Sequence, residues 1–220
     1  NKPWNDDLLD YLASYLKENK YDLKKLIGHI ASSRAYQLKA ATFAEEPAAE
    51  NFVYNGPMLK RMTAEQFMDA VWLVTGTAPA KADAPLPKDI PLATGSAKRN
   101  FVRAVLVHST MLMRTLGRPN REQVVTTRSE LLTTLEALDL ASGAIFHDIV
   151  SRGGKQIFTE LKDKNKDVII KNVYMRSLGR NPDASELSAA AGLLGEKPDA
   201  DSLADLLWVI FLLPEFQLIS

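Results

Sequence analysis

Three arginines and one glutamate gather in a short stretch of the sequence where the helical pattern is interrupted. Arg118, Arg121 and Glu122 surround Pro119, and Arg128 follows one short stretch later. Guanidinium groups bind carboxylate and phosphate oxygens through paired N–H donors. The cluster therefore predicts either a binding site for an anionic ligand or an ion-pair network that fixes a loop. Within the loop, we expect Glu122 and Arg128 to face inward and Arg118 and Arg121 outward.

A second candidate for chemistry is the stretch 163–167, which reads Asp-Lys-Asn-Lys-Asp. Its alternating oxygen ligands resemble the opening of an EF-hand calcium loop. The rest of the motif is missing, because Val168 stands where the loop needs glycine and Tyr174 where it needs the bidentate glutamate. The sequence therefore favours a solvated loop that leads into a helix, and we expect no metal site here.

The three histidines His29, His108 and His147 are far apart in the sequence. No two of them have the four-residue spacing that places two imidazoles on one face of a helix. His108 lies in an apolar stretch, which favours a core or boundary position, and His147 beside Asp148 is typical of a solvated helix surface. The chain has no cysteine, so disulfides, zinc thiolates and covalent haem attachment are excluded within it.

Other motifs of catalysis are incomplete. Residues 153–156, Gly-Gly-Lys-Gln, lack the first glycine and the hydroxyl residue of a phosphate-binding loop, and no Gly-x-Ser-x-Gly elbow is present. We therefore predict no catalytic residue and no cofactor, and whether the chain serves an enzyme stays open.

The elements that must position these residues are helical. Apolar residues recur at helical spacing over residues 6–18 and from Asp22 to Tyr36, which predicts a helical hairpin. Residues 40–57 are expected to form a loop. Thr63 and Gln66 fit a capping box, and the helix that follows is expected to end at Gly76.

Prolines 79, 85, 87 and 91 make the segment 79–97 the best candidate connection between subdomains. We expect a single helical domain over 1–220, which this segment could divide into 1–78 and 98–220. Residues 101–116, after the proline-rich segment, are apolar and rich in valine, so the spacing of apolar residues alone does not distinguish a helix from a buried strand. We favour a helix.

The remaining helices are expected at 129–140, 143–161, 168–178, 184–194 and 202–213, and the one at 143–161 is weakened by Gly153 and Gly154. Residues 114–119 and 176–182 echo each other, because each joins an arginine and a leucine to a glycine, an arginine and a proline. A shared helix stop accounts for the echo better than a duplicated unit does. Sustained two-residue alternation is absent, so the fold class is all-α: an irregular multi-helix bundle with a long proline-rich connection.

Composition is that of an ordinary globular chain, with 46% hydrophobic and 25% charged residues among 220. Lys and Arg (27) balance Asp and Glu (27), so no overall field draws the protein to nucleic acid or an anionic membrane. Apolar runs stop short of the length of a membrane span, and the first residues do not resemble a signal peptide.

Several weak motifs occur in one order along nearly the whole chain, and together they resemble domain of unknown function family 1553. The stretches that carry the resemblance are 7–13, 22–27, 33–36, 61–65, 118–122, 174–180 and 213–216. Where the family usually has Phe-Asp-x-Pro-Asp-Arg-Glu, residues 116–122 lack both aspartates. The resemblance implies an exported protein, periplasmic or extracellular, of planctomycete-type or Bacteroidetes origin, often with a cytochrome c-like domain upstream.

Two functions follow as expectations. The first is a non-catalytic helical module that docks onto upstream domains of the same larger polypeptide. The second is a share of an enzyme active site, acting on polysaccharide, in which Arg118, Arg121, Glu122 and Arg128 contact the ligand.

Overall fold

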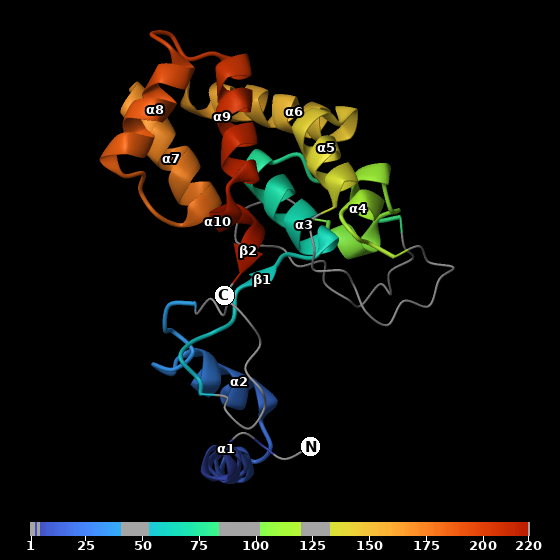
Figure 1. Cartoon of the computed structure of the whole chain (residues 1–220), viewed down its shortest axis with the longest axis vertical. Coiled ribbons are helices and arrows are strands. Elements are labelled where there is room, and N and C mark those ends of the chain that lie inside the picture. The colour runs from blue at the N-terminus through green and yellow to red at the C-terminus, as the bar shows by residue number, and fades with distance from the viewer. Residues whose placement is uncertain (1–2, 4, 41–52, 84–101, 120–132, 220) are drawn as a thin grey trace. The chain divides into compact units, whose positions relative to one another are not determined.

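The computed structural model describes residue 3 and residues 5–40, 53–83, 102–119 and 133–219, and it is all-α (Figure 1). The expected fold class of an irregular multi-helix protein is confirmed. The chain divides into two compact units, 1–60 together with Ser220, and 61–219. The two units are built differently.

The first unit contains the helical hairpin predicted from the sequence. Its helices are α1 (Asp6–Glu18) and α2 (Leu23–Ala31). Asn5 caps α1 through a side-chain oxygen that accepts the Leu8 N–H, and Asp22 caps α2 in the same way. The second helix ends at Ala31 rather than near Tyr36, because the backbone passes into turns there.

The hairpin is held by aromatic contacts near its surface. Tyr15 stacks on the His29 imidazole with ring centroids 4.2 Å apart, and the Tyr11 hydroxyl is 2.9 Å from His29 Nε2. Neither helix contains a buried residue. The hairpin therefore has no helical core of its own.

The remaining elements lie in the second unit, except that β1 begins at Lys60 of the first. They are β1 (Lys60–Arg61), α3 (Ala64–Thr75), a 3-10 turn η2 (Ala104–Leu106), α4 (Met111–Thr115), α5 (Thr134–Ser142), α6 (Ala144–Leu161), α7 (Lys166–Leu178), α8 (Ala184–Leu194), α9 (Ala200–Leu212), α10 (Pro214–Gln217) and β2 (Leu218–Ile219). The four helices predicted from residue 143 onward are confirmed with ends shifted by no more than two residues, whereas the helix predicted at 129–140 begins only at Thr134, after the N-cap Thr133. Residues 129–132 of the helix predicted at 129–140 lie outside the described part.

Helix α3 begins and ends where its sequence signals predict. Thr63 and Gln66 form the reciprocal capping box, and Gly76 ends the helix with a left-handed φ of 69°. Phe67, Met68 and Val71 face the core, with 4% or less of their surface exposed. Strands β1 and β2 form a two-stranded sheet.

Helices α6 and α9 pack side by side and form the centre of the second unit (Figure 1). Phe146 of α6 contacts Phe211 of α9, and Phe211 lies 4.7 Å from Phe216 of α10 between ring centroids. Phe67 of α3 completes this aromatic cluster, with its ring 5.9 Å from that of Phe216. The core thus joins helices from both ends of the unit.

Two adjacent glycines make the close approach of α6 possible. A Cβ on Gly154 would collide with the Ala200 carbonyl oxygen at the start of α9, and one on Gly153 would lie 2.5 Å from the Thr75 side chain. Helix α6 runs unbroken through both glycines. Their effect on the stability of the helix stays a prediction, and their place in the structure is one of close packing.

The single helix predicted over 101–116 is also wrong. The chain instead forms η2, an extended link and the short helix α4. Carboxylates accept two of the backbone donors in this stretch: Asp69 accepts the Ala104 N–H at 2.6 Å, and Asp83 accepts the His108 N–H at 2.7 Å. These distant partners replace the hydrogen bonds of a continuous helix.

The boundary between the two compact units does not fall in the proline-rich segment. Helix α3 precedes residues 79–97 but belongs to the same unit as the helices that follow them, and the division falls between Lys60 and Arg61. Most of that segment, residues 84–97, lies outside the described part, as do residues 41–52 of the loop predicted at 40–57. That the chain is a single domain stays a prediction.

Candidate functional site

Arg118 does not point outward as its sequence context predicts. Its guanidinium donates to the Ala104 carbonyl at 2.9 Å and to the Val105 carbonyl at 3.3 Å, and it lies 3.6 Å from the Glu65 carboxylate. Only 14% of the side chain is exposed. Arg118 therefore ties η2 to the first turn of α3, which is a structural task.

The other three members of the predicted cluster, Arg121, Glu122 and Arg128, lie outside the described residues. Their part in ligand binding, and the inward position expected for Glu122 and Arg128, stay predictions. Within the described part, the cluster has one member, and that member faces the protein.

The three histidines lie on different segments of the chain. His29 packs in the hairpin of the first unit. His108 is exposed, not in the core or at its boundary, because the link between η2 and α4 turns it outward. His147 is exposed on α6 with its Nε2 atom 3.4 Å from the Ser151 hydroxyl, and the neighbouring Asp148 pairs with Arg152.

No group of histidine, aspartate and glutamate side chains that could hold a metal occurs in the part of the chain that the structure describes. In the loop resembling an EF-hand opening, Asn165 uses its side chain to cap α7 by accepting the Asp167 N–H. Within that same part, no helix combines the length and the apolar character needed to cross a membrane.

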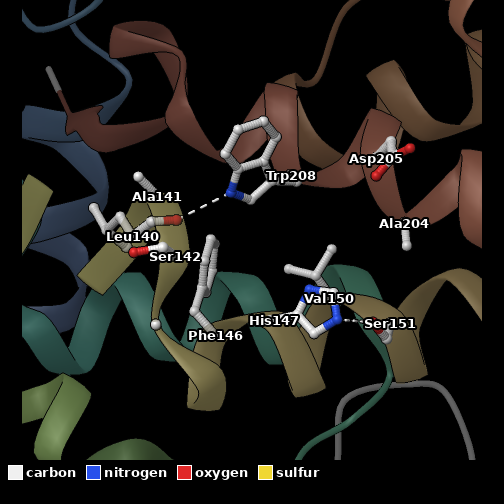
Figure 2. A pocket seen from close by; sticks show the side chains of 11 residues that line it. Leu140, Ala141, Ser142, Phe146, His147, Val150, Ser151, Ala204, Asp205 and Trp208 are labelled. Atoms are coloured by element: carbon white, nitrogen blue, oxygen red, sulfur yellow. Dashed lines mark hydrogen bonds between the residues drawn. The ribbon is translucent and has the colours of Figure 1, made fainter. Parts of the chain in front are cut away.

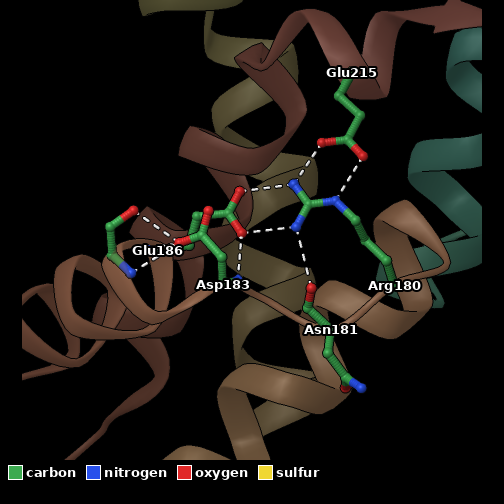
Figure 3. Close-up of polar contacts among 6 residues, drawn as sticks. Arg180, Asn181, Asp183, Glu186 and Glu215 are labelled. Carbon is green, nitrogen blue, oxygen red and sulfur yellow. Dashed lines mark hydrogen bonds and ion pairs between the residues drawn. The ribbon is translucent and has the colours of Figure 1, made fainter.

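The densest polar cluster of the described residues surrounds Arg180, just after α7 (Figure 3). Its guanidinium makes two bonds to Glu186 of α8 and two to Glu215 of α10, all between 2.6 and 2.7 Å. A further bond joins it to the Asn181 carbonyl at 3.1 Å. Since a guanidinium has five N–H donors, every one of them is used. The cluster is a clamp between three helices rather than a site for an anion.

Electrostatics follow from this geometry. The Arg180 hydrogen bonds lower the pKa of Glu186 and of Glu215, because they stabilise the ionised carboxylates. The same bonds raise the pKa of Arg180. Burial raises the pKa of Tyr174, whose ring centroid lies 5.9 Å from the Arg180 guanidinium carbon.

Sequence reasoning missed this clamp, although one signal for it was visible. The echo between 114–119 and 176–182 places an arginine directly after a glycine in both stretches. Both glycines have a left-handed φ, 88° at Gly117 and 71° at Gly179, and both following arginines fold back onto a neighbouring helix. The shared helix stop thus brings with it a shared arginine anchor.

A second ion pair is more deeply buried. Arg61 binds Glu136 of α5 through two hydrogen bonds, and only 4% of the Glu136 side chain is exposed. Glu136 also completes the capping box of α5 with Thr133. This pair fixes the start of α5 beside β1, and nothing in its sequence spacing predicts it.

The first unit exposes apolar side chains on both of its helices, α1 and α2. Leu9 is 54% exposed, Leu23 62% and Ile27 64%. A contiguous patch of exposed apolar residues is typical of an interaction surface. We call these residues, with Leu8 and Tyr11, the hairpin surface.

The fold and these polar clusters define an all-α protein in which the clustered charges hold helices together. The family model for PSD1, described as protein of unknown function (DUF1553), matches residues 1–194, so the chain belongs to this family. The match spans both units and ends with α8; the stretch 213–216, which also resembles the family, lies beyond it. No curated protein and no solved structure matches the chain.

Proposed function

We propose that the chain is a non-catalytic helical docking module of a larger exported polypeptide, and that the hairpin surface is the part that docks. The observation that carries the proposal is that the hairpin combines well-formed amphipathic helices with an absence of buried residues in them. Its helices are well capped and strongly amphipathic, yet neither contains a buried residue. Because residues 1–194 match the family model, the hairpin belongs to the region that the family shares.

The partner that suits this surface is apolar. A two-helix hairpin without a core is only marginally stable, and most helical stability in proteins comes from packing an apolar face against another element. Leucine and isoleucine side chains gain from burial in a protein interface and offer little to a polar small molecule. We therefore assign the surface to an upstream domain of the same polypeptide, of the cytochrome c-like kind that the family resemblance implies, in a periplasmic or extracellular location.

A charge placed on the hairpin surface tests the proposal. Ile27→Asp should weaken binding of the separately produced upstream domain at least about tenfold, because a carboxylate would be desolvated in an apolar interface. The melting temperature of the chain itself should hardly change, since Ile27 is mostly exposed. Lys25→Asp, a change of charge at an exposed position two residues from both Leu23 and Ile27 and therefore on the other face of α2, is the matched control and should bind like the unmodified chain.

Isothermal titration calorimetry with the upstream domain measures both variants. Equal affinity for Ile27→Asp and the unmodified chain would overturn the proposal. So would a self-associating chain in sedimentation velocity whose association Ile27→Asp abolishes, because the surface would then bind a second copy.

The alternative function, a share of a polysaccharide-degrading active site, depends on the arginine cluster contacting a ligand. Arg118 supports it poorly, because its guanidinium is engaged by Ala104, Val105 and Glu65. The alternative would have to rest on Arg121, Glu122 and Arg128, which lie outside the described residues.

A further inference from the structure

A cavity of about 260 Å³ opens in the second unit between the α5–α6 turn, α6 and α9 (Figure 2). It lies wholly within that unit and shares no residue with the hairpin surface. The volume is slightly below the usual range for drug-sized ligands, so its occupant would be a single small ring.

The floor and one wall of the cavity are apolar. Leu140, Phe146 and Val150 form the floor and are 3% exposed or less. The wall is the half-buried indole of Trp208, whose Nε1–H donates to the Leu140 carbonyl at 3.0 Å. Because that bond uses the only polar atom of the indole, the ring offers a ligand its π surface alone.

Polar groups line the same cavity on both helices. Asp205 lies three residues before Trp208 on α9, and His147 and Ser151 lie four residues apart on α6, so each pair shares a helix face (Figure 2). Among the described residues, Asp205 makes no hydrogen bond or ion pair through its carboxylate. Its two oxygens can accept hydroxyl hydrogen bonds, and the His147 imidazole can donate or accept one.

The charge of the residues that line the cavity indicates which ligands it can bind. Among the described residues that line the cavity there is no lysine or arginine, and the one formal charge is the Asp205 carboxylate. Phosphates and carboxylates are therefore disfavoured. A quaternary ammonium is best held by a cage of several aromatic faces, whereas here one indole faces the cavity and Phe146 is only 1% exposed beneath it.

We propose that this cavity binds one hexopyranose ring of a neutral saccharide. The apolar C–H face of the ring would lie on the Trp208 indole, and its hydroxyls would bond to Asp205 and His147. A neutral ring with one apolar face and a hydroxylated edge matches a pocket with one aromatic wall, the Asp205 carboxylate beside that wall and His147 on the facing helix. This inference is independent of the docking function, because the two surfaces share no residue.

Nuclear magnetic resonance of the ¹⁵N-labelled full chain tests the site, with methyl β-D-glucopyranoside and methyl β-D-galactopyranoside as probes. At least one should shift the Trp208 indole N–H resonance saturably, with a Kd on the order of millimolar, because a small ligand makes few contacts. Asp205→Asn should weaken that binding about tenfold, as expected for loss of a charged acceptor. Asp163→Asn, at an exposed aspartate outside the cavity, is the matched control and should leave the Kd unchanged.

His147→Ala gives a second variant that should also weaken binding, and circular dichroism checks that each variant is folded. Three results would overturn the proposal: no saturable shift with either glycoside, equal affinity in Asp205→Asn and the unmodified chain, or tighter binding of choline or inorganic phosphate than of both glycosides. The first result would remove the site, and the last would reassign its ligand.

Discussion

At the scale of single residues, the two arginines that follow left-handed glycines act as anchors. Arg118 follows Gly117 and holds η2, whereas Arg180 follows Gly179 and joins α7, α8 and α10. A glycine in the left-handed conformation ends the helix and reverses the chain at little steric cost. The next side chain is thereby directed back onto the protein, where a long planar cation can reach several acceptors.

Arg118→Ala should destabilise the chain by about 1–2 kcal/mol, because the η2 carbonyls lose a charged donor in a mostly buried setting. Arg114→Ala, at an exposed arginine of the preceding helix α4, should change the free energy of unfolding by no more than about 0.5 kcal/mol. Urea unfolding compares the two variants. A loss for Arg114→Ala equal to that for Arg118→Ala would show that the anchor has no special role.

Arg180→Ala should lower the free energy of unfolding by about 1 kcal/mol at pH 7, since the clamp is a network but partly exposed. Arg152→Ala removes a single exposed ion pair with Asp148 and should cost less than about 0.5 kcal/mol. Urea unfolding at pH 7 measures both variants, and equal losses would mean that the clamp stabilises no more than an isolated surface pair.

The Arg180 clamp also predicts a pH dependence. Glu186 and Glu215 have pKa values below their ordinary range in the folded chain, so the unfolded chain binds more protons on acidification. The stabilisation that these two carboxylates contribute is complete above about pH 4.3, the pKa of a glutamate in the unfolded chain. It is lost as the pH falls through their lowered pKa values in the folded chain. The stability difference between the unmodified chain and Arg180→Ala should therefore shrink below about pH 4. A difference in unfolding free energy that stays constant from about pH 7 to about pH 3 would contradict this linkage.

At the scale of elements, the contact of α6 with α9 depends on glycine. The backbone of α9 reaches the position where a Gly154 Cβ would lie, and a backbone atom cannot move aside as a side chain can. Helices approach this closely only where one of them lacks a side chain. Gly192 in α8 is the opposite case, because no atom lies within 4 Å of the Cβ it would carry.

Gly154→Ala should destabilise the chain by about 1–3 kcal/mol, because the added methyl group collides with Ala200 and Ala204. Gly192→Ala should instead stabilise it by about 0.5–1 kcal/mol, because alanine loses less conformational entropy in a helix. Differential scanning calorimetry of the two variants separates packing from propensity. Melting temperatures that rise in both would show that α6 and α9 can separate without cost.

At the scale of the whole molecule, the two units differ in how their helices are stabilised. Helices α6 and α9 contain many buried residues, whereas α1 and α2 contain none. Local opening requires little free energy where few apolar contacts are lost.

Amide hydrogens of α1 and α2 should therefore exchange on the order of 100-fold faster than those of α6 and α9 in the isolated chain at about pH 7. Hydrogen exchange followed by mass spectrometry measures both sets in one sample. Equal protection in the two units would mean that the hairpin is covered in the isolated chain and would remove the basis for the docking proposal.

The sequence by itself determined the helices, because their signals are local. Caps at Asp22 and Thr63, the glycine stop at Gly76 and the apolar spacing of the C-terminal helices all act within a few residues of one another. Resemblance along the chain likewise identified the family. The sequence did not predict the interruption between η2 and α4, since that depends on carboxylates of Asp69 and Asp83 far away in the chain.

Only the tertiary structure decided what each charged or small residue does. The assembled structure places the Arg118 guanidinium on the carbonyls of η2, and it places Gly153 and Gly154 where α6 approaches Thr75 and the start of α9. Arg180 and Glu215 are 35 residues apart, so nothing in their spacing could predict their pairing. The same holds for the cavity beside Trp208, whose walls come from α6 and α9. Charge pairing and close packing depend on which surfaces meet in space, and that is a property of the assembled helices rather than of any one segment.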